Sequence, residues 1–367
     1  MAERMTVSYQ RKPCYDIIFT NGFEGLREEL AKDESLQNRK ICIVTDSNVE
    51  PLYAQAVREI ISPCVKACEI FTFPAGEENK NLQTVQSLYA FLIERHFDRK
   101  DMLAALGGGV VGDLTGFAAA TYLRGVDFIQ IPTTLLAQVD SSIGGKTGVD
   151  FDAYKNMVGA FYMPKLVYMN LDTLQTLEAR QFFNGFAEVM KHGLIKDSKF
   201  YEWLISNMYE ICDREPATML ELVKRSCEIK RSVVEKDPTE QGERALLNFG
   251  HTIGHAIEKN SNFTLMHGEC VALGCVAAAF ISWKRELIEM EEYYEIRDMF
   301  VPFNLPISME DLDVERIVEL TRSDKKMKSG QIRFVLLTKI GKAVLDDTVT
   351  EEEMKAAVEE LNFREED

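Results

Sequence analysis

Short apolar runs alternate with amphipathic stretches through the first half of the chain. Residues 49–61 and 82–95 have the apolar spacing of helices. The short runs are rich in branched residues, which favours buried strands, and they lie at residues 40–46, 67–73, 102–106, 126–131 and 166–171. Strands that are apolar throughout and alternate with helices are typical of a parallel sheet covered on both faces.

The pattern changes after about residue 172, where helical periodicity dominates. Expected helices lie at residues 185–196, 199–212, 216–236, 244–259, 267–287 and 313–322. Expected strands lie at residues 332–337 and near Val344. The sequence therefore predicts a Rossmann-like α/β domain at 1–172 and a mainly α-helical domain at 173–367, with the active site in the cleft between them.

Charge narrows the range of partners. The 367 residues carry a formal net charge of −17, and that negative field disfavours nucleic acid or an anionic membrane as a partner. No apolar run is long enough to span a membrane. An anionic small molecule would need a local cluster of cations.

The eight cysteines are scattered, and their spacings do not match a zinc site. Most lie in apolar segments, which favours buried reduced thiols and a cytoplasmic protein. The N-terminal residues lack the apolar core of a signal peptide.

A glycine-rich turn, LGGGVVGDLTGFAA at 106–119, follows an expected strand and opens a helix. Glycines and a helix N-terminus allow close approach of a pyrophosphate, although the spacing differs from the dinucleotide fingerprint. Asp46 ends an early strand and is either a ribose acceptor or a helix N-cap.

Residues 131–150, IPTTLLAQVDSSIGGKTGVD, form a polar stretch with Asp140 and Lys146. It lacks the upstream glycine of a P-loop, so nucleotide hydrolysis is not expected. We expect a ligand-lining loop rather than a solvated one.

Three of the five histidines, His251, His255 and His267, lie close together in the sequence. His251 and His255 share a helix face, and His267 opens the next helix. Together with Glu188, a carboxylate on an apolar helix face, they are suited to zinc or a similar divalent metal. Spacing alone favours the His251/His255 pair as ligands.

The motifs GGGVVGD, PTTLLAQVDSSIGGKTGV, GFAEVMKHGLI, ERALLNFGHTIGHAIE and HGECVALG, in this order, resemble the 3-dehydroquinate synthase family. The resemblance covers about residues 46–337. It implies conversion of 3-deoxy-D-arabino-heptulosonate 7-phosphate, a phosphorylated keto acid, to 3-dehydroquinate and phosphate. It also implies bound NAD and a divalent metal, zinc or cobalt.

The resemblance assigns roles to individual positions. The implied metal ligands are Glu188, His251 and His267, so His255 moves to the substrate phosphate or to proton relay. The implied catalytic residues are Lys191, Glu240, His255 and Asp140. The implied substrate-binding residues are Arg124, Lys146, Asn156, Lys230, Arg244, Asn248 and either Lys325 or Lys326. The implied NAD-binding residues are Asp46, Asn48, Glu77, Lys80, Gly108, Gly109, Asp113, Thr133, Thr134, Lys155, Thr173 and Thr176.

Arg124 matches a residue that reaches the neighbouring subunit in the family, which implies a homodimer. Tyr154 and the stretch Phe182–Asn184 depart from common family residues without removing a matched functional one. The implied reaction oxidises the substrate transiently, eliminates phosphate, returns the hydride and closes the ring. The alternatives are a sister sugar phosphate cyclase and a metal-dependent polyol dehydrogenase, which would release NADH.

Overall fold

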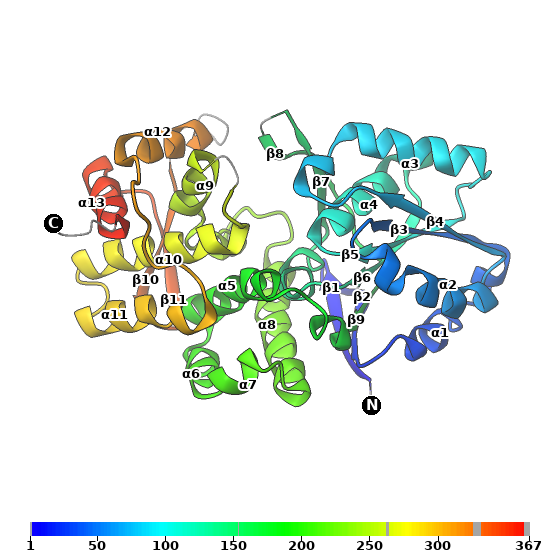
Figure 1. Cartoon of the computed structure of the whole chain (residues 1–367), viewed down its shortest axis with the longest axis horizontal. Helices are drawn as coiled ribbons and strands as arrows, with labels where there is room; N and C mark the ends of the chain where they lie inside the picture. The colour runs from blue at the N-terminus through cyan, green and yellow to red at the C-terminus, as the bar shows by residue number, and fades with distance from the viewer. Residues whose placement is uncertain (1, 153, 262–263, 326–331, 363–367) are drawn as a thin grey trace. The chain divides into compact units, whose positions relative to one another are not determined.

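The computed structural model describes residues 2–152, 154–261, 264–325 and 332–362. The chain divides into two compact units, Met1–Leu177 and Glu178–Asp367 (Figure 1). Each unit is considered by itself below. None of the helices in the described part of the chain is long and apolar enough to cross a bilayer.

Unit 1 is built on a seven-stranded sheet in the order β1-β2-β9-β6-β5-β3-β4. Its strands are β1 (Glu3–Tyr9), β2 (Lys12–Thr20), β3 (Lys40–Asp46), β4 (Ala67–Phe73), β5 (Met102–Gly107), β6 (Asp127–Pro132) and β9 (Leu166–Asn170). All neighbouring strands pair in parallel except β1, which pairs with β2 in antiparallel fashion. The prediction of a parallel α/β sheet is confirmed.

Helices cover both faces of this sheet, as the apolar runs predict. The helices are α1 (Glu24–Leu30), α2 (Gln55–Ile61), α3 (Leu82–Glu94) and α4 (Gly109–Thr121). Successive β3 residues point to opposite faces: Ile43 packs in a core with α1 and α2, and Val44 in a second core with α3 and α4. Figure 1 shows the ribbons of α1 and α2 on one side of these strands and that of α3 on the other. The β-strands are therefore buried on both sides.

The stretch expected to be a ligand-lining loop is only partly a loop. A short helical turn at Ala137–Ser141 is followed by β7 (Lys146–Phe151), which pairs with β8 (Tyr154–Phe161) as an antiparallel hairpin. Thr147 and Val149 of β7 are buried, because this strand packs on α4. The polar composition of residues 131–150 gave no indication of strand β7.

Unit 2 is mainly helical, as predicted. Its helices are α5 (Ala179–Lys196), α6 (Ser198–Ser206), α7 (Met208–Cys212), α8 (Pro216–Lys236), α9 (His251–Asn260), α10 (His267–Lys284), α11 (Met290–Asp298), α12 (Val314–Lys325) and α13 (Glu351–Leu361). A small antiparallel pair, β10 (Phe334–Lys339) and β11 (Lys342–Asp346), completes it. Helix α10 is buried on almost all sides, because α5, α9, α11, α13 and β10 pack around it.

Two expected helices are interrupted. The helix expected at 199–212 breaks at Asn207 into α6 and α7. The helix expected at 244–259 is a 3₁₀ helix, η8 (Glu243–Asn248), followed by α9. The break between them lies at Gly250, whose left-handed backbone (φ 79°) interrupts helical hydrogen bonding.

Candidate active site

A fully buried carboxylate lies at the centre of the candidate site in unit 2. Glu188 has 0% of its surface exposed and projects from the middle of α5. Lys191, one turn further along α5 and 1% exposed, forms an ion pair with Glu188 Oε2. Burying two charges costs free energy unless each is compensated. The buried pair of Glu188 and Lys191 therefore indicates a functional role more than a stabilising one.

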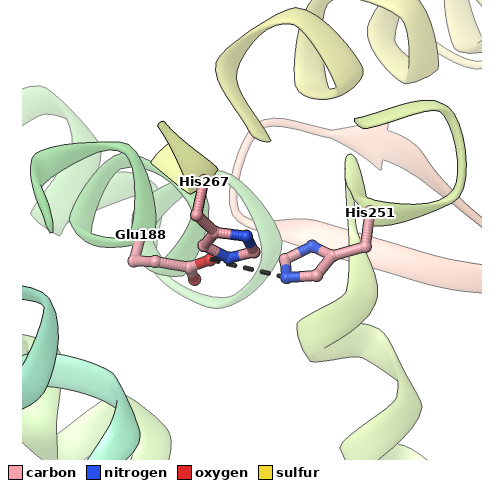
Figure 2. Close-up of side chains that lie close together, drawn as sticks. All are labelled: Glu188, His251 and His267. Carbon is pink, nitrogen blue, oxygen red and sulfur yellow. Dashed lines mark ion pairs between the residues drawn. The ribbon is translucent and has the colours of Figure 1, made fainter. Parts of the chain in front are cut away.

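Two imidazoles face the same carboxylate from two other helices. His251 is the first residue of α9 and His267 the first of α10. The Nε2 atoms of both rings lie 3.5 Å from Glu188 Oε1, and the ring centroids are 5.4 Å apart (Figure 2). One donor atom from each of the three residues lies within 4.8 Å of the other two.

Glycines allow the histidine-bearing helices to approach this closely. A Cβ at Gly274 of α10 would lie 1.8 Å from the Gly250 carbonyl oxygen, and one at Gly254 of α9 would lie 2.6 Å from the Cys270 carbonyl oxygen. Both distances are far below van der Waals contact. The backbones of α10 and of the α9 N-terminal region are therefore in direct van der Waals contact.

Neighbouring groups orient the two rings. His251 Nδ1 lies 3.0 Å from the Phe249 carbonyl oxygen, which accepts its hydrogen and leaves the Nε2 lone pair toward Glu188. His267 Nδ1 faces Glu258 Oε2 at 3.9 Å, and Glu258 is itself buried. A histidine whose second nitrogen faces a carbonyl or carboxylate is the usual arrangement around a protein-bound metal.

The site's electrostatics favour a cation at its centre. Burial alone would raise the pKa of Glu188, but the Lys191 ammonium and the two imidazoles hold it well below its ordinary range. Burial and Lys191 lower the pKa of His251 well below its ordinary value. Burial alone would lower the pKa of His267, but Glu188 and Glu258 raise it to about 9.

These donors fit a divalent metal. Neither carboxylate oxygen of Glu188 accepts a hydrogen bond of normal geometry from the residues that the structure describes. One carboxylate and two imidazoles form a ligand set typical of catalytic zinc or cobalt, with further positions open to water or substrate. The spacing-based preference for the His251/His255 pair is not favoured, because the group around Glu188 contains His267 instead.

Glu258 was not among the residues singled out from the sequence. Replacing it with Gln is expected to weaken divalent-metal binding about tenfold, because outer groups that orient a ligating histidine usually contribute 10- to 100-fold to affinity. Titration of metal-free protein with Co²⁺ measures this. An unchanged dissociation constant would show that Glu258 does not orient His267.

Other predicted residues of unit 2 lie on elements that pack against α5. Lys230 of α8 is 5% exposed and Arg244 of η8 is 2% exposed, and α5, α8 and η8 pack against one another. Three adjoining elements therefore each carry a buried cation, in a chain whose net charge is −17.

A loop anchored by Asp237 presents Arg244. Asp237 Oδ2 accepts the backbone N–H groups of Gly242 (2.7 Å) and Arg244 (3.0 Å). The Arg244 guanidinium donates to the Pro238 carbonyl oxygen at 2.6 Å. Asn248 donates to Glu240 Oε1 at 2.8 Å, so two further predicted residues contact each other.

The predicted NAD-binding residues of unit 1 gather at one edge of the sheet. Asp46 ends β3, Gly108 and Gly109 follow β5, and Thr133 and Thr134 follow β6. Glu77 follows β4, and Thr173 and Thr176 follow β9. The carboxyl ends of parallel strands meet at the same edge, so these residues share it. The order in which strands are added to the sheet reverses between β3 and β5, because β4 lies on one side of β3 and β5 on the other. Ligands of open α/β sheets bind at such a switch point.

An ion-pair network lies beside this edge. Lys80, 4% exposed, contacts Glu77 at 2.6 Å, Asp113 at 3.6 Å and Asp150 at 3.9 Å. Burial raises the pKa of Asp113 to about 6, against the opposing effect of Lys80. Lys155 of β8 lies 4.0 Å from Glu77.

The glycine turn and its neighbours fit a nucleotide. Gly108 precedes the first residue of α4, and no side chain caps this helix end. Thr133 Oγ1 is buried without a hydrogen-bond partner among the described residues. Asp46 Oδ1 accepts the N–H groups of Asn48 and Val49 and so closes the turn before the helical segment Glu50–Ala54, whose N-cap is Val49 rather than Asp46.

Of the remaining predicted residues of unit 1, Asn156 joins the ion-pair network through its backbone N–H, which donates to Asp150 Oδ1 at 2.7 Å. Asp140 is half-buried in the turn before β7, and Lys146 and Asn156 are exposed on the β7–β8 hairpin. Arg124 is exposed in a turn with left-handed backbone (φ 67°). Lys325 ends α12, and Lys326 falls outside the described residues.

Comparisons with known proteins agree with this architecture. A family model described as 3-dehydroquinate synthase N-terminal matches residues 70–184, and one described as 3-dehydroquinate synthase C-terminal matches residues 185–327. A 3-dehydroquinate synthase from Acetivibrio thermocellus is 48% identical over 315 residues, which cover 86% of this chain and 88% of the relative.

Two solved structures share the fold. A 2-epi-5-epi-valiolone synthase from Streptomyces hygroscopicus with NAD⁺ and Zn²⁺ bound has a TM-score of 0.88 at 26% identity, covering 97% of this chain and 99% of that chain. A 2-deoxy-scyllo-inosose synthase complexed with carbaglucose-6-phosphate, NAD⁺ and Co²⁺ has a TM-score of 0.88 at 24% identity, with the same coverage. The fold is that of the sugar phosphate cyclases. Within that class, the chain belongs to the 3-dehydroquinate synthase family.

Proposed function

We propose that this protein converts 3-deoxy-D-arabino-heptulosonate 7-phosphate to 3-dehydroquinate and phosphate, using NAD and a divalent metal. Membership of the 3-dehydroquinate synthase family supports the reaction. The single structural observation that carries the proposal is the buried group of Glu188, His251 and His267, whose donor atoms converge within 4.8 Å.

NAD would supply a transient hydride acceptor, and the metal a Lewis acid for the substrate's hydroxyl oxygens. Glu188 Oε1 and the Nε2 atoms of His251 and His267 would hold the metal. Phe249 and Glu258 would fix the two rings through Nδ1. Glu188 and Glu258 raise the pKa of His267 to about 9 and so favour its protonated ring, whose proton would be displaced when that ring binds a cation.

The chain's own residues would hold one substrate conformer. Lys191, Lys230 and Arg244 would pair with its anionic groups, because buried cations bind carboxylate and phosphate with charge-assisted hydrogen bonds. His255 lies one helical turn from His251, with ring centroids 5.0 Å apart, and would face the phosphate or relay a proton. Glu240, held by Asn248, is the proposed proton acceptor.

In unit 1 the carboxyl edge of the sheet would hold NAD. Absence of a Cβ at Gly108 and Gly109 lets a pyrophosphate approach the α4 N-terminus. Asp140, Lys146 and Asn156 are the proposed substrate contacts of this unit, and Lys326 remains an alternative to Lys325. We also propose a homodimer in which Arg124 reaches the neighbouring subunit, and a cytoplasmic location, which the eight free cysteines support.

Phosphate release tests this function. The protein is incubated with NAD and either the heptulosonate phosphate or a carboxylate-free heptulose 7-phosphate, with and without chelator. The acid substrate is expected to release phosphate faster, chelator is expected to stop release, and NADH is not expected to accumulate. Stoichiometric NADH would favour a polyol dehydrogenase, and preference for the carboxylate-free sugar would favour a sister cyclase.

A further inference from the structure

One face of α5 carries three polar residues spaced four apart. Arg180, Asn184 and Glu188 follow one another by one turn each, so they project along the same side of the helix. Glu188 is the proposed metal ligand. The other two contact the first turn of α10, the helix that begins at the proposed ligand His267.

Arg180 forms a two-pronged ion pair with the α10 N-terminus. Its Nε lies 2.7 Å from Glu269 Oε1, and its Nη2 lies 2.8 Å from Glu269 Oε2. Glu269 Oε2 also accepts the backbone N–H of Met266 at 2.8 Å. Through Glu269, Arg180 is therefore linked to Met266, the residue immediately before His267.

Asn184 fixes the residue immediately after the ligand. Its Oδ1 accepts the backbone N–H of Gly268 at 2.5 Å, in a buried contact. A Cβ at Gly268 would lie 1.9 Å from the Asn184 carbonyl oxygen, so the two backbones are in direct contact there. His267 therefore has no room to move along α5 independently of Glu188.

We infer that Arg180 and Asn184 are positioning residues of the metal site, which hold His267 at the distance from Glu188 that metal binding requires. This inference rests on the proposed metal site and adds to it the contacts that preserve its geometry. Neither residue touches the metal or substrate in this scheme. A ligand pair carried by two separate helices has the right geometry only if the helices are locked together near the ligands.

The chain offers a matched control in the same unit. Arg285 makes the same two-pronged contact with Glu353, at 2.5 and 2.7 Å. Glu269 and Glu353 are equivalent, because each is the third residue of its helix and completes a capping box. The Arg285 contact involves α13, which carries no proposed ligand. Loss of either arginine removes a two-pronged pair, and loss of Arg285 also removes bonds to Asp346 and Thr348, so this control is the more severe of the two for stability. Only the Arg180 contact lies beside His267.

The experiment compares Arg180→Gln, Asn184→Ala and Arg285→Gln in full-length protein freed of metal by chelation. Co²⁺ affinity, the visible absorption of bound Co²⁺, NAD affinity and Tm are measured for each. Arg180 and Asn184 line a small cavity of about 130 Å³, so shortening them enlarges an existing hollow and is compatible with folding. Asn184→Asp retains an oxygen acceptor for Gly268 and is the conservative variant.

Arg180→Gln and Asn184→Ala are expected to bind Co²⁺ about 10- to 100-fold more weakly, with an altered Co²⁺ spectrum and unchanged NAD affinity. Arg285→Gln is expected to lower Tm without changing either metal readout. Asn184→Asp is expected to recover part of the affinity. Wild-type Co²⁺ affinity and spectrum in both α5 variants would overturn the inference. Failure of the wild-type protein to bind Co²⁺ would instead overturn the proposed metal site itself.

Discussion

Glu188→Gln is expected to abolish stoichiometric metal binding and to lower phosphate release by about 1000-fold or more. The amide keeps the shape of the side chain but removes the charge that faces both imidazoles at 3.5 Å. The loss also leaves Lys191 buried beside a neutral group, so a cation would enter next to an uncompensated ammonium. Metal content after dialysis and phosphate release with saturating metal measure the two effects.

Controls separate a lost ligand from a lost fold. Removing one member of a buried ion pair costs about 3–5 kcal/mol, so the circular dichroism and Tm of Glu188→Gln must be followed. Glu243→Gln is a matched substitution, because Glu243 also pairs with lysine but is partly exposed. Retention of one tightly bound metal per chain in Glu188→Gln would contradict the proposed ligand set.

The sheet was predictable because its strands are apolar throughout. The run at 40–46 coincides with β3, since a strand buried on both faces needs a continuous apolar sequence. The N-terminal hairpin of β1 and β2 was not predicted. Its turn at Gln10 and Arg11 adopts left-handed backbone without the glycine or asparagine that usually signals such a turn.

The site was only partly readable from residue types. Clustered histidines and a carboxylate on an apolar helix face indicated a metal, because such groups are rarely buried without a partner. Which histidines converge depends on contacts between α5 and α10. One such contact joins Asn184 to Gly268, 84 positions apart in the sequence. Asn184 and Glu258 carried no local signal, since their roles arise only when α10 packs against both α5 and α9.

Arg244→Ala is expected to remove the preference for an acid substrate. The side chain is 2% exposed, and its guanidinium is held by the Pro238 carbonyl oxygen within a loop that Asp237 anchors. A fixed, buried guanidinium binds a carboxylate strongly because its side chain loses little conformational entropy on binding. Loss of such a charge-assisted bond costs about 2–4 kcal/mol, or about 30- to 1000-fold in kcat/KM.

The carboxylate-free heptulose 7-phosphate distinguishes this role from a general loss of activity. It has no partner for Arg244, so its slower turnover should change little, and the ratio of kcat/KM for the two substrates should fall toward one. Arg244→Lys keeps the positive charge but loses the planar guanidinium, so its ratio of kcat/KM values should lie between those of the wild type and Arg244→Ala. Lys236→Ala removes an exposed cation near the same loop and should leave the ratio unchanged. An unaltered ratio in Arg244→Ala would assign the carboxylate to another cation, of which buried Lys230 is the first to test.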